Sequence, residues 1–269
     1  MINESINNEI NQLRFQGKSD KELKGLYIKR NSLNIDPESF IYRICRADFL
    51  LEDIKNSEIT LVKVGPDSFA DPLENPLLNK RFTEGNESFT LGFLENYYAS
   101  CWTNDPVNKK WRWTEFLKGR TGVRIKVSLQ KFMNRLMDTR DNYFMLHYFA
   151  VKVIYEDDQV LDDLMASNDY TTFLDSLGQK GALLASTLSD SLEHEREIRI
   201  IYSHMPENQF VVNRVKVKNS LCKLPFNWSD LIEEVLIAEY LPFEKHAILE
   251  SELRSLGICC SIESGKSEN

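Results

Sequence analysis

Short runs of β-branched and aromatic residues recur along this chain and predict β-strands. In Gly122–Val127, valine and isoleucine alternate with Arg124 and Lys126, so one face is apolar and the other basic. Phe210–Val217 also alternates and is expected to form a hairpin across Met205–Gln209. The other predicted strands are Phe40–Cys45, Glu58–Val64, Tyr97–Thr103, Tyr143–Tyr155, Ile198–Tyr202, Val235–Leu241 and Gly257–Glu263.

Apolar residues at helical spacing predict helices between these strands. The helix expected over Asp48–Asn56 directs Phe49, Leu50 and Ile54 inward. The remaining expected helices are Asn108–Lys118, Leu129–Met137 with Ser128 as its N-cap, two short helices within Asp157–Ser176, and Glu244–Leu256.

The N-terminal residues 1–36 are polar and predict a helical hairpin. Ser19 and Glu22 have the spacing of a capping box, in which each side chain accepts from the other residue's backbone N–H. We expect this segment to be a helical extension through which copies of the chain form a homo-oligomer. At the other end, residues 264–269 are expected to form a disordered tail.

The order of the predicted elements favours an α+β fold over a regular doubly wound one. We expect a mixed, mainly antiparallel sheet with short helices packed around it, in a single domain over residues 37–263. No Gly-x-Gly-x-x-Gly or phosphate-loop spacing occurs, which removes the main support for a Rossmann fold or a nucleotide triphosphatase.

Composition narrows the class of protein further. The net charge of −8 over 269 residues argues against a general binder of nucleic acid or anionic membranes. Five cysteines without a Cys-x-x-Cys pair support neither a zinc site nor a disulfide framework. Because the chain shows neither a signal peptide nor a membrane-spanning apolar run, we expect a cytoplasmic protein with no membrane partner.

The stretch Leu192–Tyr202 carries the most concentrated charge pattern. If it is extended throughout, Glu193, Glu195 and Glu197 point to one face and form a row of carboxylates. Such a row needs cations or a polar ligand to offset its repulsion. The pattern therefore predicts either a solvated edge strand with salt bridges or a ligand site at the mouth of a sheet.

A proline-rich loop over residues 65–76 offers a second polar cluster. Its carboxylates Asp67, Asp71 and Glu74 are oxygen ligands of the kind that divalent cations accept, and a metal-dependent nuclease would join them to the glutamates near residue 195. The alternative is that the aspartates form turns and cap backbone amides of the loop. We favour the turns and expect no metal site.

For the other reactive side chains, a structural role is the alternative to a functional one. His147 lies in an apolar run and is expected to be a hydrogen-bonded core residue. Cys101 has no assignable histidine partner and is expected to be a small buried hydrophobe. Further candidates are Trp102, Trp111 and Trp113, which could stack a base or a nicotinamide ring or pack in the core, and Arg120, Arg124 and Lys126, which could bind phosphate or form a solvated face.

Several motifs together resemble an uncharacterised bacterial family, the domain of unknown function numbered twenty-nine seventy-one. They are Tyr42-Arg43-Ile44, the loop Ser68–Glu74, Ala99–Thr103 with its tryptophan, Trp111 and Trp113, Gly122–Ile125, Val153–Tyr155 and Glu195–Arg199, which follow one another in the family's order over residues 40–263. The chain departs from the family pattern at Ala70 and at Leu192. This resemblance implies no activity.

A second resemblance, to the ADP-ribosyltransferases, does imply one. The strand with Tyr42 and Arg43, the strand with Ser100 and Thr103, and the Glu195-x-Glu197 motif are similar to that family's arginine, Ser-Thr-Ser and Glu-x-Glu elements. Here Cys101-Trp102 interrupts the serine motif. The resemblance implies NAD as the substrate.

The same resemblance implies a role for each residue. Arg43 would hold the NAD phosphates, Ser100 would shape the nicotinamide pocket, Glu197 would be catalytic, and Glu195 would orient the acceptor. Tyr42, Trp102 and Thr103 would complete the pocket.

Three functions therefore remain open. The first is ADP-ribosyl transfer or NAD hydrolysis, with NAD or another nucleotide-like molecule as ligand, a protein or nucleic acid as acceptor, and a toxin or defence role. The second is a non-catalytic ligand-sensing or protein-interaction module. The third is the metal-dependent nuclease.

Overall fold

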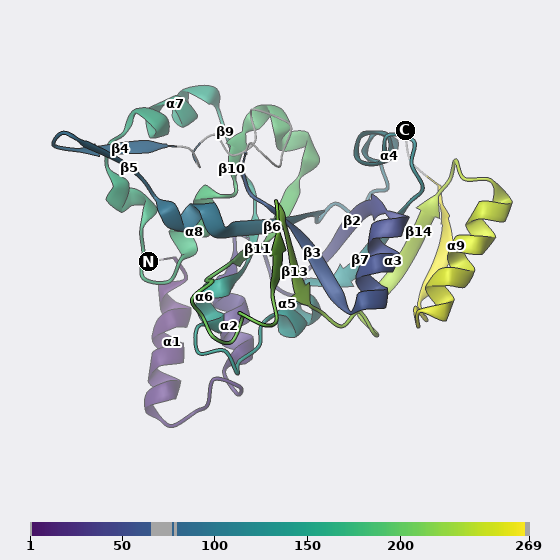
Figure 1. The fold of residues 1–269 in the computed structure, drawn as a ribbon, viewed down its shortest axis with the longest axis horizontal. Coiled ribbons are helices and arrows are strands. Elements are labelled where there is room, and N and C mark those ends of the chain that lie inside the picture. Colours follow the sequence, from purple (N-terminus) through teal and green to yellow (C-terminus); the bar gives the residue numbers. More distant parts are fainter. Residues whose placement is uncertain (1, 66–76, 78–79, 267–269) are drawn as a thin grey trace.

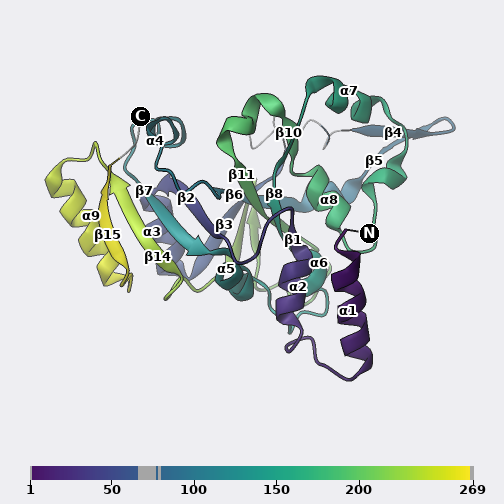
Figure 2. The same ribbon diagram turned by 180° about the vertical axis from the view of Figure 1, so that it is seen from behind.

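The computed structural model describes residues 2–65, 77 and 80–266 (Figures 1 and 2). Within these residues, eleven strands form one sheet. The strands are β1 (Ser32–Leu33), β2 (Phe40–Arg46), β3 (Glu58–Lys63), β6 (Tyr97–Thr103), β7 (Gly122–Ser128), β8 (Tyr148–Lys152), β11 (Glu197–Ser203), β12 (Lys216–Lys218), β13 (Leu221–Pro225), β14 (Ile232–Ala238) and β15 (Ser261–Gly265).

The sheet branches at β6. Its main path runs β1-β8-β11-β6-β2-β7-β14-β15, and a second arm continues from β6 through β3 and β13 to β12. The pairings β1–β8 and β14–β15 are parallel, and the others in this sheet are antiparallel. This confirms the predicted α+β fold with a mixed, mainly antiparallel sheet.

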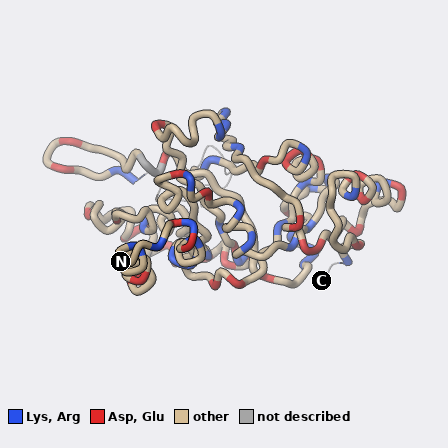
Figure 3. The backbone as a smooth tube through the Cα atoms, turned by 90° about the horizontal axis from the view of Figure 1, so that it is seen from below, with Lys and Arg blue, Asp and Glu red and all other residues tan. Residues whose placement is uncertain are grey.

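Two small ribbons flank the large sheet. One is the hairpin of β4 (Arg81–Glu84) and β5 (Glu87–Thr90), which protrudes from the body (Figure 1). The other is the parallel pair β9 (Ile154–Glu156) and β10 (Thr187–Ser189). Basic and acidic residues are interleaved along much of the chain (Figure 3).

Helices cover both faces of the sheet. The α-helices are α1 (Glu4–Phe15), α2 (Lys24–Asn31), α3 (Ala47–Asn56), α4 (Lys110–Leu117), α5 (Leu129–Leu136), α6 (Phe144–His147), α7 (Asp158–Ala166), α8 (Gln179–Leu184) and α9 (Phe243–Ser255). Short 3-10 turns occur at η2 (Gly92–Asn96), η3 (Tyr170–Phe173) and η4 (Asp190–Glu195).

The two faces differ in how completely they are covered. On one face, side chains such as Ile125 and Trp102 form a continuous core with α2, α3, α5 and α9. On the other face the apolar packing is divided into two clusters. A small one lies under α4 around Trp113 and Leu117, and a larger one lies under α7 and α8 around Phe149 and other apolar residues. Part of the candidate site lies on this second face.

Three predictions of local structure are wrong. Tyr143–Tyr155 begins as α6, because the Asp141 carboxylate accepts from the Tyr143 N–H and starts a turn. The residues from Phe210 onward also form turns, because the Asn208 side chain accepts from the Phe210 N–H; the ladder there is β12 with β13. Phe49 points outward and is 56% exposed, with the Arg46 guanidinium 4.1 Å from its ring centroid.

Other local predictions are confirmed. The Ser19 N–H donates to Glu22 Oε2 at 2.9 Å and the Glu22 N–H donates to Ser19 Oγ at 3.4 Å, which is the expected capping box. Ser128 Oγ accepts from the Lys131 N–H at 3.4 Å at the start of α5. Leu50 is buried as expected.

The N-terminal helices pack against the sheet. Tyr27 and Ile28 of α2 belong to the large core, and β1 pairs with β8 directly after α2. The division into an extension and one domain, and the oligomer through these helices, stay predictions. At the other terminus, β15 extends to Gly265, two residues beyond the strand end expected at Glu263.

No helix in the described part of the chain combines the length and the apolar composition needed to cross a lipid bilayer. The cytoplasmic location stays a prediction.

Candidate functional site

The candidate site lies where β2 and β3 diverge from the same edge of β6. β6 pairs with β3 at Tyr98 and Ala99 and with β2 at Thr103. The stretch Ser100–Trp102 therefore borders the space between the two arms of the sheet. On the α4 side, this space is not filled by either apolar cluster, and it forms a pocket of about 310 Å³.

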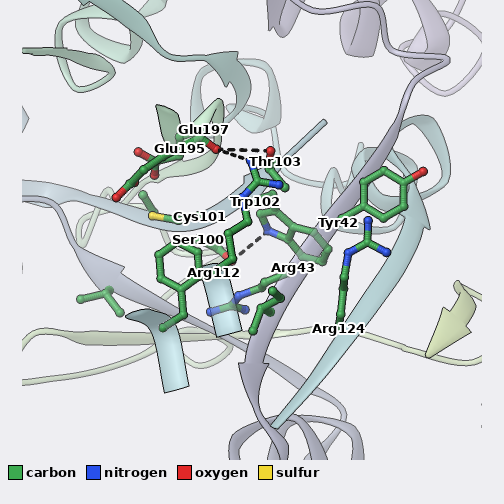
Figure 4. A pocket seen from close by; sticks show the side chains of 14 residues that line it. Tyr42, Arg43, Ser100, Cys101, Trp102, Thr103, Arg112, Arg124, Glu195 and Glu197 are labelled. Carbon is green, nitrogen blue, oxygen red and sulfur yellow. Dashed lines mark hydrogen bonds between the residues drawn. The ribbon is translucent and has the colours of Figure 1, made fainter. Parts of the chain in front are cut away.

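All seven residues predicted for the site line this pocket (Figure 4). They are Tyr42, Arg43, Ser100, Trp102, Thr103, Glu195 and Glu197. The other lining residues are Ile44, Val62, Ala99, Cys101, Arg112, Phe116 and Arg124.

Strand register divides the site residues between the two faces of the sheet. Thr103 is opposite both Tyr42 and Glu197, so these three form a row on the α4 face. Ser100 and Arg43 occupy positions whose side chains point to the other face. The structure thus brings Glu197 and Ser100 to one pocket but on opposite faces of the strands that carry them.

Glu197 makes a two-point ion pair with a buried arginine. Arg199 Nε donates to Glu197 Oε1 at 3.0 Å and Nη2 donates to Oε2 at 3.1 Å. Both side chains point to one face because they are two residues apart in β11. Arg199 Nη1 also donates to the Ala185 carbonyl, and the Glu197 N–H donates to the Tyr155 hydroxyl. The carboxylate is therefore held in one orientation.

The predicted row of three carboxylates is wrong. Residues through Glu195 form η4, and Arg196 follows in a left-handed conformation with φ of 50°. The strand begins only at Glu197, so Glu193 is exposed and does not align with it. The physical reason is local: the Ser189 hydroxyl accepts from the Ser191 N–H and caps a helical turn where extended chain was expected.

The η4 turn is fixed to the neighbouring elements through its last backbone carbonyl. Arg112 Nη2 donates to the Glu195 carbonyl at 3.0 Å, and the Thr103 hydroxyl lies 3.4 Å from the same oxygen. Thr103 also donates to the Arg196 carbonyl at 2.9 Å. Glu195 therefore reaches the pocket rim on a backbone that α4 and β6 hold in place.

Asp105 lies close to this turn, and three cationic side chains surround its carboxylate. Its Oδ2 lies 3.2 Å from Lys109 Nζ, 3.3 Å from Arg112 Nη2 and 3.9 Å from Arg196 Nη1. Burial opposes ionisation of Asp105, but the Val107 N–H and the Lys109 and Arg112 cations outweigh it, so the pKa of the carboxyl is lowered. This ionised group links the loop after β6 to α4 and η4.

The three arginines that line the pocket differ in their availability. Arg112 is committed to Asp105 and to the Glu195 carbonyl. Arg124 lies 4.1 Å from the Tyr42 ring centroid and donates to the Pro106 carbonyl at 2.6 Å. Burial lowers the pKa of both, although an arginine remains charged at neutral pH.

Arg43, by contrast, is half-buried, and among the described residues its guanidinium makes no hydrogen bond or ion pair. It lies 5.8 Å from the Trp102 ring centroid. Its five N–H donors are therefore the least committed of the three arginines in the described part of the pocket.

Ser100 and Trp102 support one another. Trp102 Nε1 donates to Ser100 Oγ at 3.0 Å, and both residues are buried. The Trp102 ring packs edge-on against Phe132 with centroids 5.2 Å apart. Trp102 is thus mainly a core residue that borders the pocket.

The other reactive residues lie as follows. His147 is fully buried and hydrogen-bonded to the Ser203 carbonyl, which confirms the core histidine. Cys101 is half-buried and lines the pocket. Trp113 is buried under α4, while Trp111 is half-buried.

Metal binding finds no support in the described residues, where no group of three or more His, Cys, Asp or Glu side chains could hold an ion. The loop with Asp67, Asp71 and Glu74 lies outside the described residues. The metal-dependent nuclease is therefore supported only by the pattern of acidic residues in the sequence.

Sequence reasoning did not identify Arg112 and Phe116 as site residues. Arg112 lies between two tryptophans, and Phe116 lies one helical turn later. The aromatic residues of this segment predict a helix, but nothing in their spacing indicates that Arg112 faces a pocket. The Glu-x-Arg spacing of Glu197 and Arg199 could have predicted their ion pair, because alternate residues of a strand share a face.

Comparisons with known proteins give a distant structural similarity. No protein-family model matches the chain, so the resemblance to the uncharacterised family stays a prediction. No curated protein matches it either.

Among solved structures, three of DarT from Thermus sp. 2.9 are similar. The complexes with carba-NAD+ and with NAD+ each have 10% identity and a TM-score of 0.37, covering 86% of this chain and 97% of that one. The complex with ADP-ribosylated ssDNA has 11% identity and a TM-score of 0.39, covering 87% and 96%. Similarity at this level does not assign an activity.

Proposed function

We propose that the pocket binds NAD and that the chain cleaves the bond between nicotinamide and ribose, transferring ADP-ribose to an acceptor or to water. The observation that carries the proposal is the meeting of a little-committed arginine, Arg43, and a fixed carboxylate, Glu197, from separate strands at one pocket. The first suits a diphosphate and the second suits a developing positive charge.

The bond changes balance without a further reagent. The C1′–N bond breaks and its electron pair leaves with nicotinamide, which becomes neutral. An oxygen or nitrogen of the acceptor then forms a bond to C1′ and loses its proton to solvent. Positive charge develops on the ribose in between, and the Glu197 carboxylate would stabilise it.

The other predicted residues have supporting roles in this proposal. Tyr42 and Thr103 form a row with Glu197 across neighbouring strands and would contact the ribose on that face. Glu195, at the rim, would orient the acceptor. Ser100 would shape the floor of the pocket through its bond to Trp102.

A second candidate, binding without catalysis, is favoured by one observation. Both oxygens of Glu197 accept hydrogen bonds from Arg199, as in a structural ion pair. In a sensing module the same pocket would bind the nucleotide and leave it intact.

Nicotinamide release from NAD by purified protein tests the proposal. We expect release by the wild-type chain, a large loss in Glu197→Gln, and no change in Glu193→Gln, which makes the same chemical change at an exposed position. Wild-type protein that binds NAD and releases no nicotinamide, with and without candidate protein and nucleic-acid acceptors, would support the sensing module instead.

A cellular role as a toxin or defence effector would follow from the proposed reaction. Transfer of ADP-ribose to a protein or a nucleic acid would suit a toxin or defence effector. Its test is growth of cells that express the wild-type chain beside cells that express the Glu197→Gln variant.

A further inference from the structure

An aromatic cluster lies at the surface beside the pocket. We call Trp111, Phe116 and His194 the aromatic rim. The Trp111 ring centroid lies 5.0 Å from that of His194 and 6.1 Å from that of Phe116. Phe116 is 47% exposed, His194 is exposed and Trp111 is half-buried. These rings therefore present a joint aromatic surface to solvent, which is typical of a binding surface.

The aromatic rim adjoins the pocket at two points. Phe116 lines the pocket itself, and the Arg112 guanidinium, which also lines it, lies 5.3 Å from the Trp111 ring centroid. His194 directly precedes Glu195, whose carbonyl Arg112 holds. A ligand that leaves the pocket on this side meets the aromatic rim next.

The size of the pocket requires part of a dinucleotide to lie outside it. Pockets that enclose drug-sized ligands span roughly 300–1,000 Å³, and this one, of about 310 Å³, is at the lower limit. NAD consists of two nucleotides joined by a diphosphate, so it is larger than such ligands. With the nicotinamide ribose beside Glu197, the adenosine half must extend beyond the pocket.

Charge on the aromatic rim suits the rest of such a ligand. Lys110 directly precedes Trp111, and Lys109 and the 61% exposed Arg196 side chain both lie within 4 Å of the Asp105 carboxylate nearby. Stacking of a nucleobase on an aromatic side chain is favourable and tolerant of which base is bound, while nearby cations attract phosphate.

We propose that the aromatic rim is the adenine subsite, where the purine ring of NAD stacks on Trp111. This inference rests on the proposed function, because it places the other half of the same ligand. It places a subsite on α4 and η4, beside a pocket that is lined mainly by strand residues.

The test compares ligands with and without the adenine ring. Affinities of NAD, ADP-ribose and nicotinamide mononucleotide are measured by calorimetric titration for the wild-type chain, Trp111→Ala and Phe243→Ala. Phe243 is 85% exposed on α9, outside the pocket lining, and controls for loss of a surface aromatic. Unfolding curves show that each variant is folded, and Trp111→Phe is the conservative variant.

We expect Trp111→Ala to weaken NAD and ADP-ribose by about tenfold, as loss of one stacked base implies. Nicotinamide mononucleotide should keep its affinity, and Trp111→Phe should recover most of the loss. Equal weakening of all three ligands, or no weakening of any, would overturn the adenine subsite.

Failure of this inference and failure of the proposed function are distinguishable. If ADP-ribose binding depends on Trp111 and the wild-type chain releases no nicotinamide, the subsite stands and the reaction fails. If nicotinamide is released and Trp111→Ala binds NAD normally, the reaction stands and the subsite fails. If the wild-type chain binds neither NAD nor ADP-ribose, both are overturned.

Discussion

Glu197 and Arg199 form a two-point ion pair on one face of β11, with N···O distances of 3.0 and 3.1 Å, and both side chains are almost completely buried. The pair is at once part of the candidate site and part of the fold. A substitution at Glu197 therefore changes stability as well as any chemistry, and the two effects need separate measurements.

Glu197→Gln should destabilise the protein. It removes the Glu197 charge that faces the buried Arg199 guanidinium, and breaking a buried ion pair costs about 3 kcal/mol or more. Urea unfolding should show this loss, with Glu193→Gln within about 0.5 kcal/mol of wild type. Equal stability of Glu197→Gln and wild type would mean that the pair is open to water.

Arg43→Ala should weaken NAD binding and leave the stability of the protein nearly unchanged. The guanidinium has no hydrogen bond or ion pair among the described residues, and it lies over the Trp102 ring and near the Asp53 charge, so its removal should change the free energy of unfolding by about 1 kcal/mol or less. Its loss should weaken NAD binding at least tenfold, since a charge-assisted contact to a phosphate is lost. Arg43→Lys should recover only part of that affinity, because an ammonium cannot bind in a bidentate manner. Arg81→Ala, an exposed arginine on β4, is the control; strong destabilisation by Arg43→Ala would indicate a structural arginine.

Gly122→Ala should destabilise the strand beside the site. A Cβ there would lie 2.9 Å from the Cys45 carbonyl oxygen and 2.3 Å from a Leu117 methyl group, so β2, β7 and α4 would have to separate. Overpacking of this kind costs about 1–3 kcal/mol. At Gly25, in α2, nothing lies within 4 Å of a Cβ, and alanine should raise helix stability by roughly 0.5–1 kcal/mol. Thermal unfolding of the two variants should shift in opposite directions, and an unchanged or raised midpoint for Gly122→Ala would contradict the close packing at Gly122.

Stability should fall as the pH drops below about 6.5, the ordinary pKa of histidine. His147 Nδ1 faces the Ser203 carbonyl, while Nε2 lies 3.1 Å from the Asn208 amide nitrogen and 3.2 Å from Asp141 Oδ2. Burial lowers the pKa of His147, outweighing the Ser203 bond and the Asp141 charge. The unfolded chain then binds a proton that the folded chain does not.

His147 thus contributes stability that is present above pH 6.5 and is lost as the pH falls towards its folded pKa. The slope is at most about 1.4 kcal/mol per pH unit from this group. Burial lowers the pKa of His204 as well, which acts in the same direction. Urea unfolding at pH 7.5, 6.5 and 5.5 measures the effect, with His194→Gln, at an exposed histidine, as the control. Unchanged stability over this range would show that His147 is protonated in the fold.

Much of the strand framework follows from the local pattern of the sequence. β6 has the predicted bounds Tyr97–Thr103, and β2 and β7 differ from theirs by one residue, because each alternates or is apolar throughout and lies inside the sheet. The branch at β6 could not be predicted, since pairing with both β2 and β3 depends on contacts between distant segments.

The predicted site residues lie together in the fold, but their arrangement could not be predicted. The resemblance identified seven residues that line one pocket, whereas strand pairing decides which face each occupies. The row of glutamates was wrong because a local serine cap, at Ser189, overrides the alternation. Arg112 reaches the site only through the packing of α4, which no spacing in the sequence reveals.

The central claim is that this pocket is an NAD site. The most direct measurement is the unfolding midpoint of the wild-type chain with and without NAD, with nicotinamide followed in the same sample. NAD at a hundred times its dissociation constant should stabilise the folded chain by about 2.7 kcal/mol and raise the midpoint by several degrees. We predict this shift together with nicotinamide release, and loss of the shift in Arg43→Ala. An unchanged midpoint at millimolar NAD with no nicotinamide released would contradict the claim.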